Sequence, residues 1–162
     1  MGGPFIFERR IKEHMLKETI KYTDYNGKEV EEDFYFYLSK SDIIDLETSI
    51  EGGLTQVLQK ISRANNGNAV IREIKRIVLA AYGEKSPDGK RFMKSEEISK
   101  AFRETPAYDK FFMDLVTDAD KAVAFFTGIM PADMQPKMEE IKQEAKAKIE
   151  ELKKSEELRK SE

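Results

Sequence analysis

Two glycine-centred segments contain residue types that could bind a phosphate or a metal ion. Gly83-Glu84-Lys85-Ser86 ends like a phosphate-binding loop, but Glu84 separates the glycine from the lysine that such a loop places side by side. Gly89 could be the central glycine of a calcium loop that begins at Glu84. The twelfth position of that loop is Ser95, where a bidentate glutamate is required. We therefore expect neither segment to bind a nucleotide or a calcium ion.

The other residue types that perform catalysis are scarce or badly placed. The sequence of 162 residues has no cysteine and one histidine, which excludes thiol catalysis, thiolate zinc sites and histidine-pair metal sites. No serine lies in a G-x-S-x-G motif. No pair of carboxylates lies in an apolar stretch that would tune a general acid. We expect a protein that is not an enzyme and that has no cofactor and no metal.

Charge and hydropathy limit the class of partner. The net charge is -3, so a globally basic nucleic-acid-binding protein is not expected. No apolar run approaches the ~20 residues that cross a bilayer. The first 14 residues carry charges where a signal peptide has its apolar region. These patterns predict an intracellular protein with no nucleic-acid partner and no membrane partner.

Residues 1–14 differ from the patterned segment that starts at Met15. With one choice of codons, residues 8–14 encode a purine-rich ribosome-binding element just upstream of an ATG for Met15. Two interpretations are open: residues 1–14 are a translated extension that is not native, or they are a natural N-terminal arm. We divide the chain into this segment, one globular domain at residues 15–131, and a charged amphipathic C-terminal helix at residues 132–162.

Two alternating segments flank Asn26-Gly27, which is a strong signal for a β-hairpin. A two-residue loop would place the apolar residues of the two strands on opposite faces, which a half-buried sheet does not tolerate. A three-residue loop that ends with Gly27 in the left-handed conformation places the apolar residues of both strands on the same face. It pairs Leu16 with Phe36 and Lys21 with Glu31.

Capping residues and helical spacing predict a series of helices after the hairpin. Gly83 is predicted to end the third helix, and the segment from Tyr82 to Lys94 is predicted to be a long loop, with or without a short extended piece at Arg91–Met93. The fold class is therefore α+β and mainly α-helical: an N-terminal β-hairpin, a bundle of about five to six helices, and a long charged C-terminal helix. The expected N-caps are Ser39 (with Asp42 as its capping-box partner), Asn68, Ser95, Thr105 and Thr117.

Several apolar or aromatic residues are candidates for partner binding. Tyr35 and Tyr37 lie on the hairpin face opposite the core, where they form either an amphipathic surface or a binding face. Adjacent helical residues point about 100° apart. Phe112 and Phe125, each next to another phenylalanine, therefore either line a groove or subunit contact or pack between helices of one domain.

The C-terminal helix is charged and carries a narrow apolar stripe. Two interpretations of this stripe are open: it contacts a partner helix, or the helix is solvated and either lies against its own domain or frays at its end. The stripe is made of Met134, Met138, Ile141, Ala145, Ile149 and Leu152, of which we take Met138, Ile141, Ile149 and Leu152 as candidate contacts.

Several whole segments together resemble the phage tail assembly chaperones of siphophage-type tail modules. The resemblance runs from about Met15 to Pro131, and it is a likeness of segments with no catalytic signature. The similar segments are Ile20–Gly27, Glu32–Leu38, Ala81–Phe92, Phe102–Tyr108, Phe112–Leu115 and Thr117–Asp120.

The resemblance implies a non-enzymatic chaperone that acts in the host cytoplasm during tail assembly and is absent from the mature virion. Its implied partners are the tape-measure protein, the tail-tube protein and further copies of itself. Two alternatives stay open at this point. One is a structural tail or neck subunit that uses the hairpin edge to pair with its neighbours, and the other is a small helical regulator.

Overall fold

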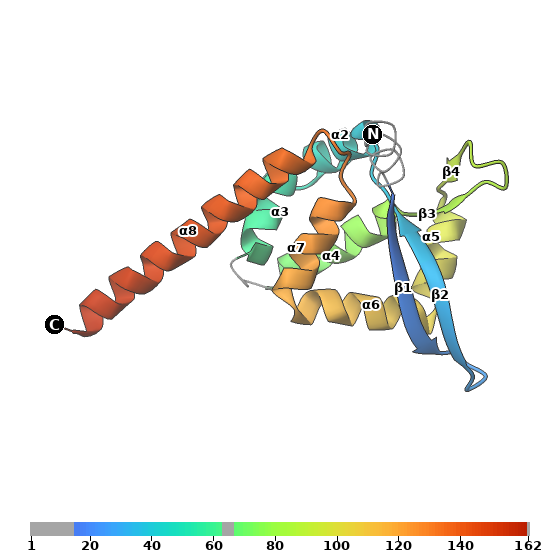
Figure 1. Ribbon diagram of the computed structural model, residues 1–162, viewed down its shortest axis with the longest axis horizontal. Coiled ribbons are helices and arrows are strands. Elements are labelled where there is room, and N and C mark those ends of the chain that lie inside the picture. Colours follow the sequence, from blue (N-terminus) through green and yellow to red (C-terminus); the bar gives the residue numbers. More distant parts are fainter. Residues whose placement is uncertain (1–14, 63–66, 162) are drawn as a thin grey trace, which may run out of the picture.

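The computed structural model describes residues 15–62 and 67–161 (Figure 1). The segment at residues 1–14, predicted to be an extension or arm, lies outside the described residues. The fold class is confirmed as α+β and mainly helical. The elements are β1 (Leu16–Thr23), β2 (Glu29–Phe36), α2 (Lys40–Ser49), α3 (Gly53–Ser62), α4 (Asn68–Ala81), β3 (Tyr82–Lys85), β4 (Phe92–Met93), α5 (Glu96–Arg103), α6 (Pro106–Thr117), α7 (Ala119–Gly128) and α8 (Gln135–Lys160).

The hairpin has the predicted three-residue loop and register. Leu16 lies opposite Phe36 and Lys21 lies opposite Glu31. Gly27 has a φ of 81°, a conformation that favours glycine, and its N–H donates to the carbonyl of Asp24. The apolar residues of both strands therefore face the helices.

The sheet has one strand that the sequence did not predict, β3, and a second, β4, that lies within the short extended piece considered at Arg91–Met93. Strands β3 and β4 extend the hairpin into a sheet with the order β1-β2-β3-β4. The prediction that Gly83 ends the third helix is wrong. Gly83 lies in β3 and pairs with Tyr35. A Cβ atom at this position would lie 2.7 Å from the ring of Phe92 and 2.9 Å from the carbonyl oxygen of Met93. The glycine is therefore required for close packing.

The helix caps were mostly predicted correctly. Ser39, Ser95 and Thr105 each accept a hydrogen bond from the first turn of their helix, and Asp42 completes the predicted capping box. Two predictions are wrong by one residue, because α4 is capped by Gly67 rather than Asn68, and α7 by Asp118 rather than Thr117. The hydroxyl of Thr117 donates to the carbonyl of Met113 at 2.7 Å, so this residue belongs to the last turn of α6.

The core is organised around Phe36, which is fully buried on the inner face of the sheet. Its ring contacts one aromatic ring from each of three helices: Phe102 of α5, Phe111 of α6 and Phe125 of α7. The centroid distances are 5.8, 5.3 and 5.2 Å. This aromatic cluster joins the sheet to the helices.

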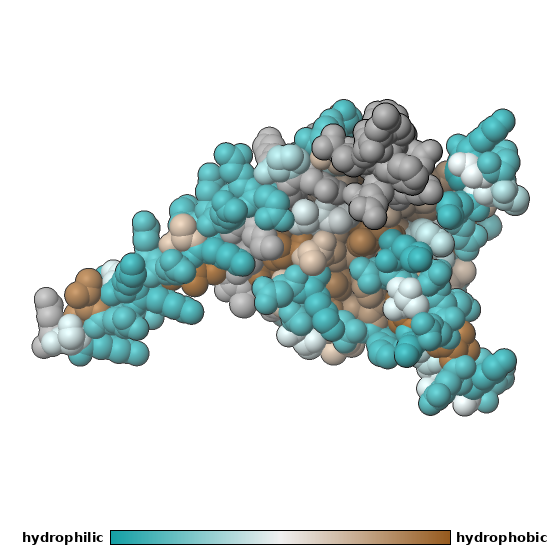
Figure 2. All heavy atoms as spheres, in the orientation of Figure 1, coloured by the Kyte–Doolittle hydropathy of each residue, from teal (hydrophilic) through white to brown (hydrophobic). Residues whose placement is uncertain are grey.

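Helix α8 differs from the other helices in its position. Its N-terminal part packs against α3 and α7, and its C-terminal part extends away from the rest of the molecule (Figure 1). Figure 2 shows that mainly hydrophilic side chains cover this extended part.

In the described part of the chain, no helix is both long and apolar enough to cross a membrane.

Candidate partner-binding surfaces

The outer face of the sheet combines aromatic rings with lysines. The side chains of Tyr35 and Tyr37 lie on this face and are both half-buried. The Nζ atom of Lys85 lies 4.3 Å from the ring centroid of Tyr35, a cation–π distance. Phe92 contacts the ring of Tyr37 edge-on at 6.4 Å. The two tyrosines therefore belong to a composite surface, which we call the aromatic–lysine face: Tyr35, Tyr37, Lys85, Phe92 and Lys94.

Three members of the aromatic–lysine face were missed from the sequence. Lys85, Phe92 and Lys94 lie in or next to β3 and β4, in a segment that we predicted to be a loop. The Pro87-Asp88-Gly89 turn between two short segments was the available signal, because it is also typical of a hairpin. Strands this short carry too few residues to show alternation.

Lys94 connects the aromatic–lysine face to α2. Its Nζ atom donates to the carbonyl oxygen of Tyr37 at 2.6 Å and to the carboxylate of Asp42 at 2.9 Å. Burial alone raises the pKa of Asp42, but the hydrogen bonds from Lys94 and from the Ser39 amide outweigh it. The pKa of Asp42 therefore lies below its ordinary value.

This lowered pKa predicts a loss of stability in acid. The ionised Asp42 stabilises the fold above its unfolded pKa of about 3.9, and this contribution disappears as the pH falls through the lower folded value. We expect the urea midpoint to fall between pH 6 and pH 3, and to fall less in Asp42→Asn. The control is Asp45→Asn, an exposed change on the same helix. Equal acid sensitivity of the two variants would contradict the assignment.

The two candidate phenylalanines lie in different environments. Phe125 is 2% exposed and packs against Phe36 and Phe111, so it is a core residue of this chain and we do not propose it as a partner contact. Phe112 is half-buried, and its ring stacks on that of Tyr108 at 5.7 Å. Part of the Phe112 side chain remains accessible on α6.

The candidate residues on α8 differ in exposure along the helix. Ile141 is 8% exposed and belongs to the core, whereas Ile149 is half-buried and Leu152 is 62% exposed. The side chain of Met138 lies outside the described residues. The stripe is thus covered by the chain itself at Ile141 and uncovered at Leu152.

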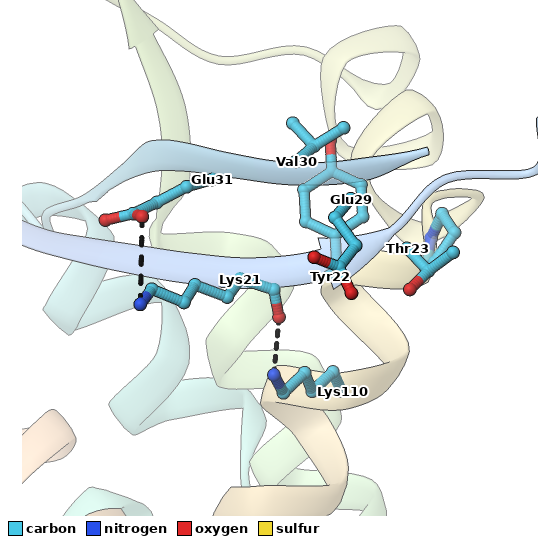
Figure 3. Close-up of a pocket in the computed structure, with 8 residues that line it drawn as sticks. Lys21, Tyr22, Thr23, Glu29, Val30, Glu31 and Lys110 are labelled. Atoms are coloured by element: carbon cyan, nitrogen blue, oxygen red, sulfur yellow. Dashed lines mark hydrogen bonds and ion pairs between the residues drawn. The ribbon is translucent and has the colours of Figure 1, made fainter. Parts of the chain in front are cut away.

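A cleft of about 610 Å³ lies between the hairpin and the start of α6 (Figure 3). The carbonyl oxygen of Lys21 points away from β2 and accepts a hydrogen bond from Lys110. Across the strands, the Nζ atom of Lys21 lies 3.9 Å from the carboxylate of Glu31, and both side chains are mostly exposed. Such an exposed pair contributes little to stability. The lysine and glutamate side chains of the cleft are solvent-exposed. Such an arrangement suits binding better than catalysis.

A second hollow of about 670 Å³ lies along the edge of β1 that faces away from β2, between that strand, α6 and α7. We call it the β1 groove. Burial raises the pKa of Glu18 in this groove, and the positive charge of Lys121 partly offsets the effect. The apolar residues that line the groove are Leu16, Ile20, Phe111, Leu115, Ala124 and Phe125.

The loop that we weighed as a phosphate or calcium site is held together by its own hydrogen bonds. The hydroxyl of Ser86 donates to the carboxylate of Asp88 and accepts from the amide of Arg91. The Asp88 carboxylate also accepts from the amide of Lys90, and these bonds hold its pKa below the ordinary value. Among the described residues, no group of three or more potential metal ligands is present.

The comparisons with known proteins give one match. A family model described as phage tail assembly chaperone matches residues 15–162. No curated protein and no solved structure matches the chain.

Proposed function

Because the chain belongs to the phage tail assembly chaperone family, we propose that it is a non-enzymatic factor that binds the tape-measure protein of its phage. It helps to recruit tail-tube subunits, acts as a homo-oligomer in the host cytoplasm, and is absent from the mature virion. The observation that carries this proposal is the family match, which covers residues 15–162.

Two surfaces support a role in binding protein clients. The aromatic–lysine face offers half-buried tyrosines, a residue type that is enriched in interfaces. The extended part of α8 offers Ile149 and Leu152 on a helix that projects from the molecule. We propose that residues 15–131 form the body of the chaperone and that residues 132–162 form an arm that contacts the helical client.

The solubility of the tape-measure protein tests whether the arm contacts it. We expect Ile149→Ser with Leu152→Ser to weaken binding of the co-expressed tape-measure protein about ten-fold, the effect of losing about 1.4 kcal/mol. The measurement is the fraction of tape-measure protein in the soluble lysate.

The matched control for the arm is Lys146→Ser with Lys153→Ser, which places the same residue type at two exposed positions of the same helix. This variant should keep the client soluble. If both double variants keep it soluble to the same extent, Ile149 and Leu152 are not client contacts.

A structural tail or neck subunit is the alternative. The observation that favours it is the edge of β1 opposite β2, which pairs with no other strand among the described residues. Mass spectrometry of purified virions separates the two functions. The chaperone is expected to be absent from them, and stoichiometric amounts in the virion would favour the structural subunit.

A further inference from the structure

The edge of β1 that faces away from β2 carries backbone groups that no other described strand uses. In the described part of the chain β1 is an edge strand, paired with β2 alone. The amide of Asp24 donates to the carbonyl of Lys28, and hydrogen-bonded pairs alternate from there along an antiparallel ladder. The backbone groups of Lys17, Thr19 and Lys21 therefore point away from β2. The Lys21 carbonyl, which Lys110 reaches, agrees with this direction (Figure 3).

The β1 groove lies directly beside these backbone groups. Its apolar lining comes from the inner face of β1 and from α6 and α7. Figure 2 shows apolar surface on this side of the molecule, between α7 and β1. An extended segment that pairs with β1 would place alternate side chains on the groove side, because successive residues of a strand point to opposite faces. There they would meet the half-buried Leu16 and the exposed Ala124, above the buried Ile20, Phe111 and Leu115.

The charged side chains near the β1 edge differ between the inner and the outer face of the sheet. Within the groove, Glu18 and Asp114 are balanced by Lys110 and Lys121. On the outer face of β1, Lys17 is exposed and lies opposite the uncharged Tyr35. The side chain of Lys21 is also mostly exposed. An added strand thus meets an inner face on which apolar residues and balanced charges alternate. On the outer face it lies beside Lys17 and Lys21, of which Lys21 is also 3.9 Å from Glu31.

We propose that the β1 edge and the β1 groove bind an extended segment of a partner protein by β-strand addition. The segment alternates apolar residues, which enter the groove, with acidic residues, which lie beside Lys17 and Lys21. Strand β2 shows one such pair on the opposite edge of β1, where Glu31 faces Lys21. The proposal goes beyond binding of the tape-measure protein, because it does not require that the segment come from that protein.

Thr19 allows a test that acts on the backbone alone. Its amide points to the free edge, so Thr19→Pro removes a donor to the added strand without breaking a bond to β2. The matched control is Thr19→Val, which keeps the amide. Both variants lose the hydrogen bond from the Thr19 hydroxyl to Asp33.

The probe is a short fluorescent peptide that alternates valine and glutamate, and its dissociation constant is measured by fluorescence anisotropy with the full chain. We expect binding to wild type and to Thr19→Val, and binding at least about ten-fold weaker to Thr19→Pro. Lys17→Glu with Lys21→Glu should reverse the preference in favour of a peptide that alternates valine and lysine. Circular dichroism verifies that each variant is folded.

A second measurement avoids any change to the protein. Methylating the backbone amides on one edge of the valine–glutamate peptide should abolish its binding to wild type. Equal binding of the methylated and unmethylated peptides, or of Thr19→Pro and Thr19→Val, would overturn the proposal. Self-association of the wild type that Thr19→Pro abolishes, without peptide binding, would also overturn it by assigning the edge to a second copy.

Discussion

The variant Phe36→Ala is expected to lower the free energy of unfolding by about 3–5 kcal/mol. Phe36 is fully buried, and its ring touches an aromatic ring from each of α5, α6 and α7. Removing it leaves a cavity at the point where the sheet meets three helices. Because small domains are stable by about 5–15 kcal/mol, the loss is a large share of the total. Urea unfolding followed by circular dichroism measures it.

The control for Phe36→Ala is Tyr25→Ala at the tip of the hairpin, where the side chain is 84% exposed. This change should alter stability by less than about 0.5 kcal/mol, as surface substitutions usually do. A Phe36→Ala variant as stable as Tyr25→Ala would show that the aromatic cluster is not the core of the fold.

Adding a single methyl group at Gly83 is expected to destabilise the protein by about 1–3 kcal/mol, the usual effect of overpacking. In Gly83→Ala the new Cβ atom would lie 2.7 Å from the ring of Phe92 and 2.9 Å from the Met93 carbonyl oxygen. The Phe92 ring can move, whereas the backbone oxygen moves only with β4. We therefore expect the loss of stability to accompany a displacement of the β3–β4 hairpin.

Thermal unfolding of Gly83→Ala, alone and combined with Phe92→Ala, tests this account. The double variant should be less destabilised than the sum of the two single variants, because one contact is responsible for part of both effects. Strict additivity would show that the close approach of Phe92 to Gly83 does not restrict the size of the residue at position 83.

The hairpin and most helix starts could be predicted from the sequence because their signals are local. Asn26-Gly27 and the parity of the apolar residues determine the register of β1 and β2. Ser39 and Asp42 mark the start of α2 through a capping box that lies within four residues of chain. Thr117 was misassigned because it and Asp118 are both good N-caps. In the structure Thr117 bonds to Met113 of α6, while Asp118 accepts from the amides of Asp120 and Lys121 in α7.

The remaining features depend on contacts between distant residues. Strand β3 exists because Gly83 pairs with Tyr35, far earlier in the chain, and four residues do not carry a strand signal of their own. The position of Lys94 between Tyr37 and Asp42 has the same origin. The candidate surfaces were therefore only partly visible in the sequence: the tyrosines could be named, but the lysines beside them and the β1 groove could not.

The proposal that this chain binds the tape-measure protein during tail assembly is tested most directly by the mass of the complex that the two proteins form. The two proteins from one genome are co-expressed, purified through a tag on the tape-measure protein, and examined by size-exclusion chromatography with light scattering. We predict one soluble complex with many copies of this chain per tape-measure protein. A tape-measure protein that aggregates while this chain elutes alone would contradict the account.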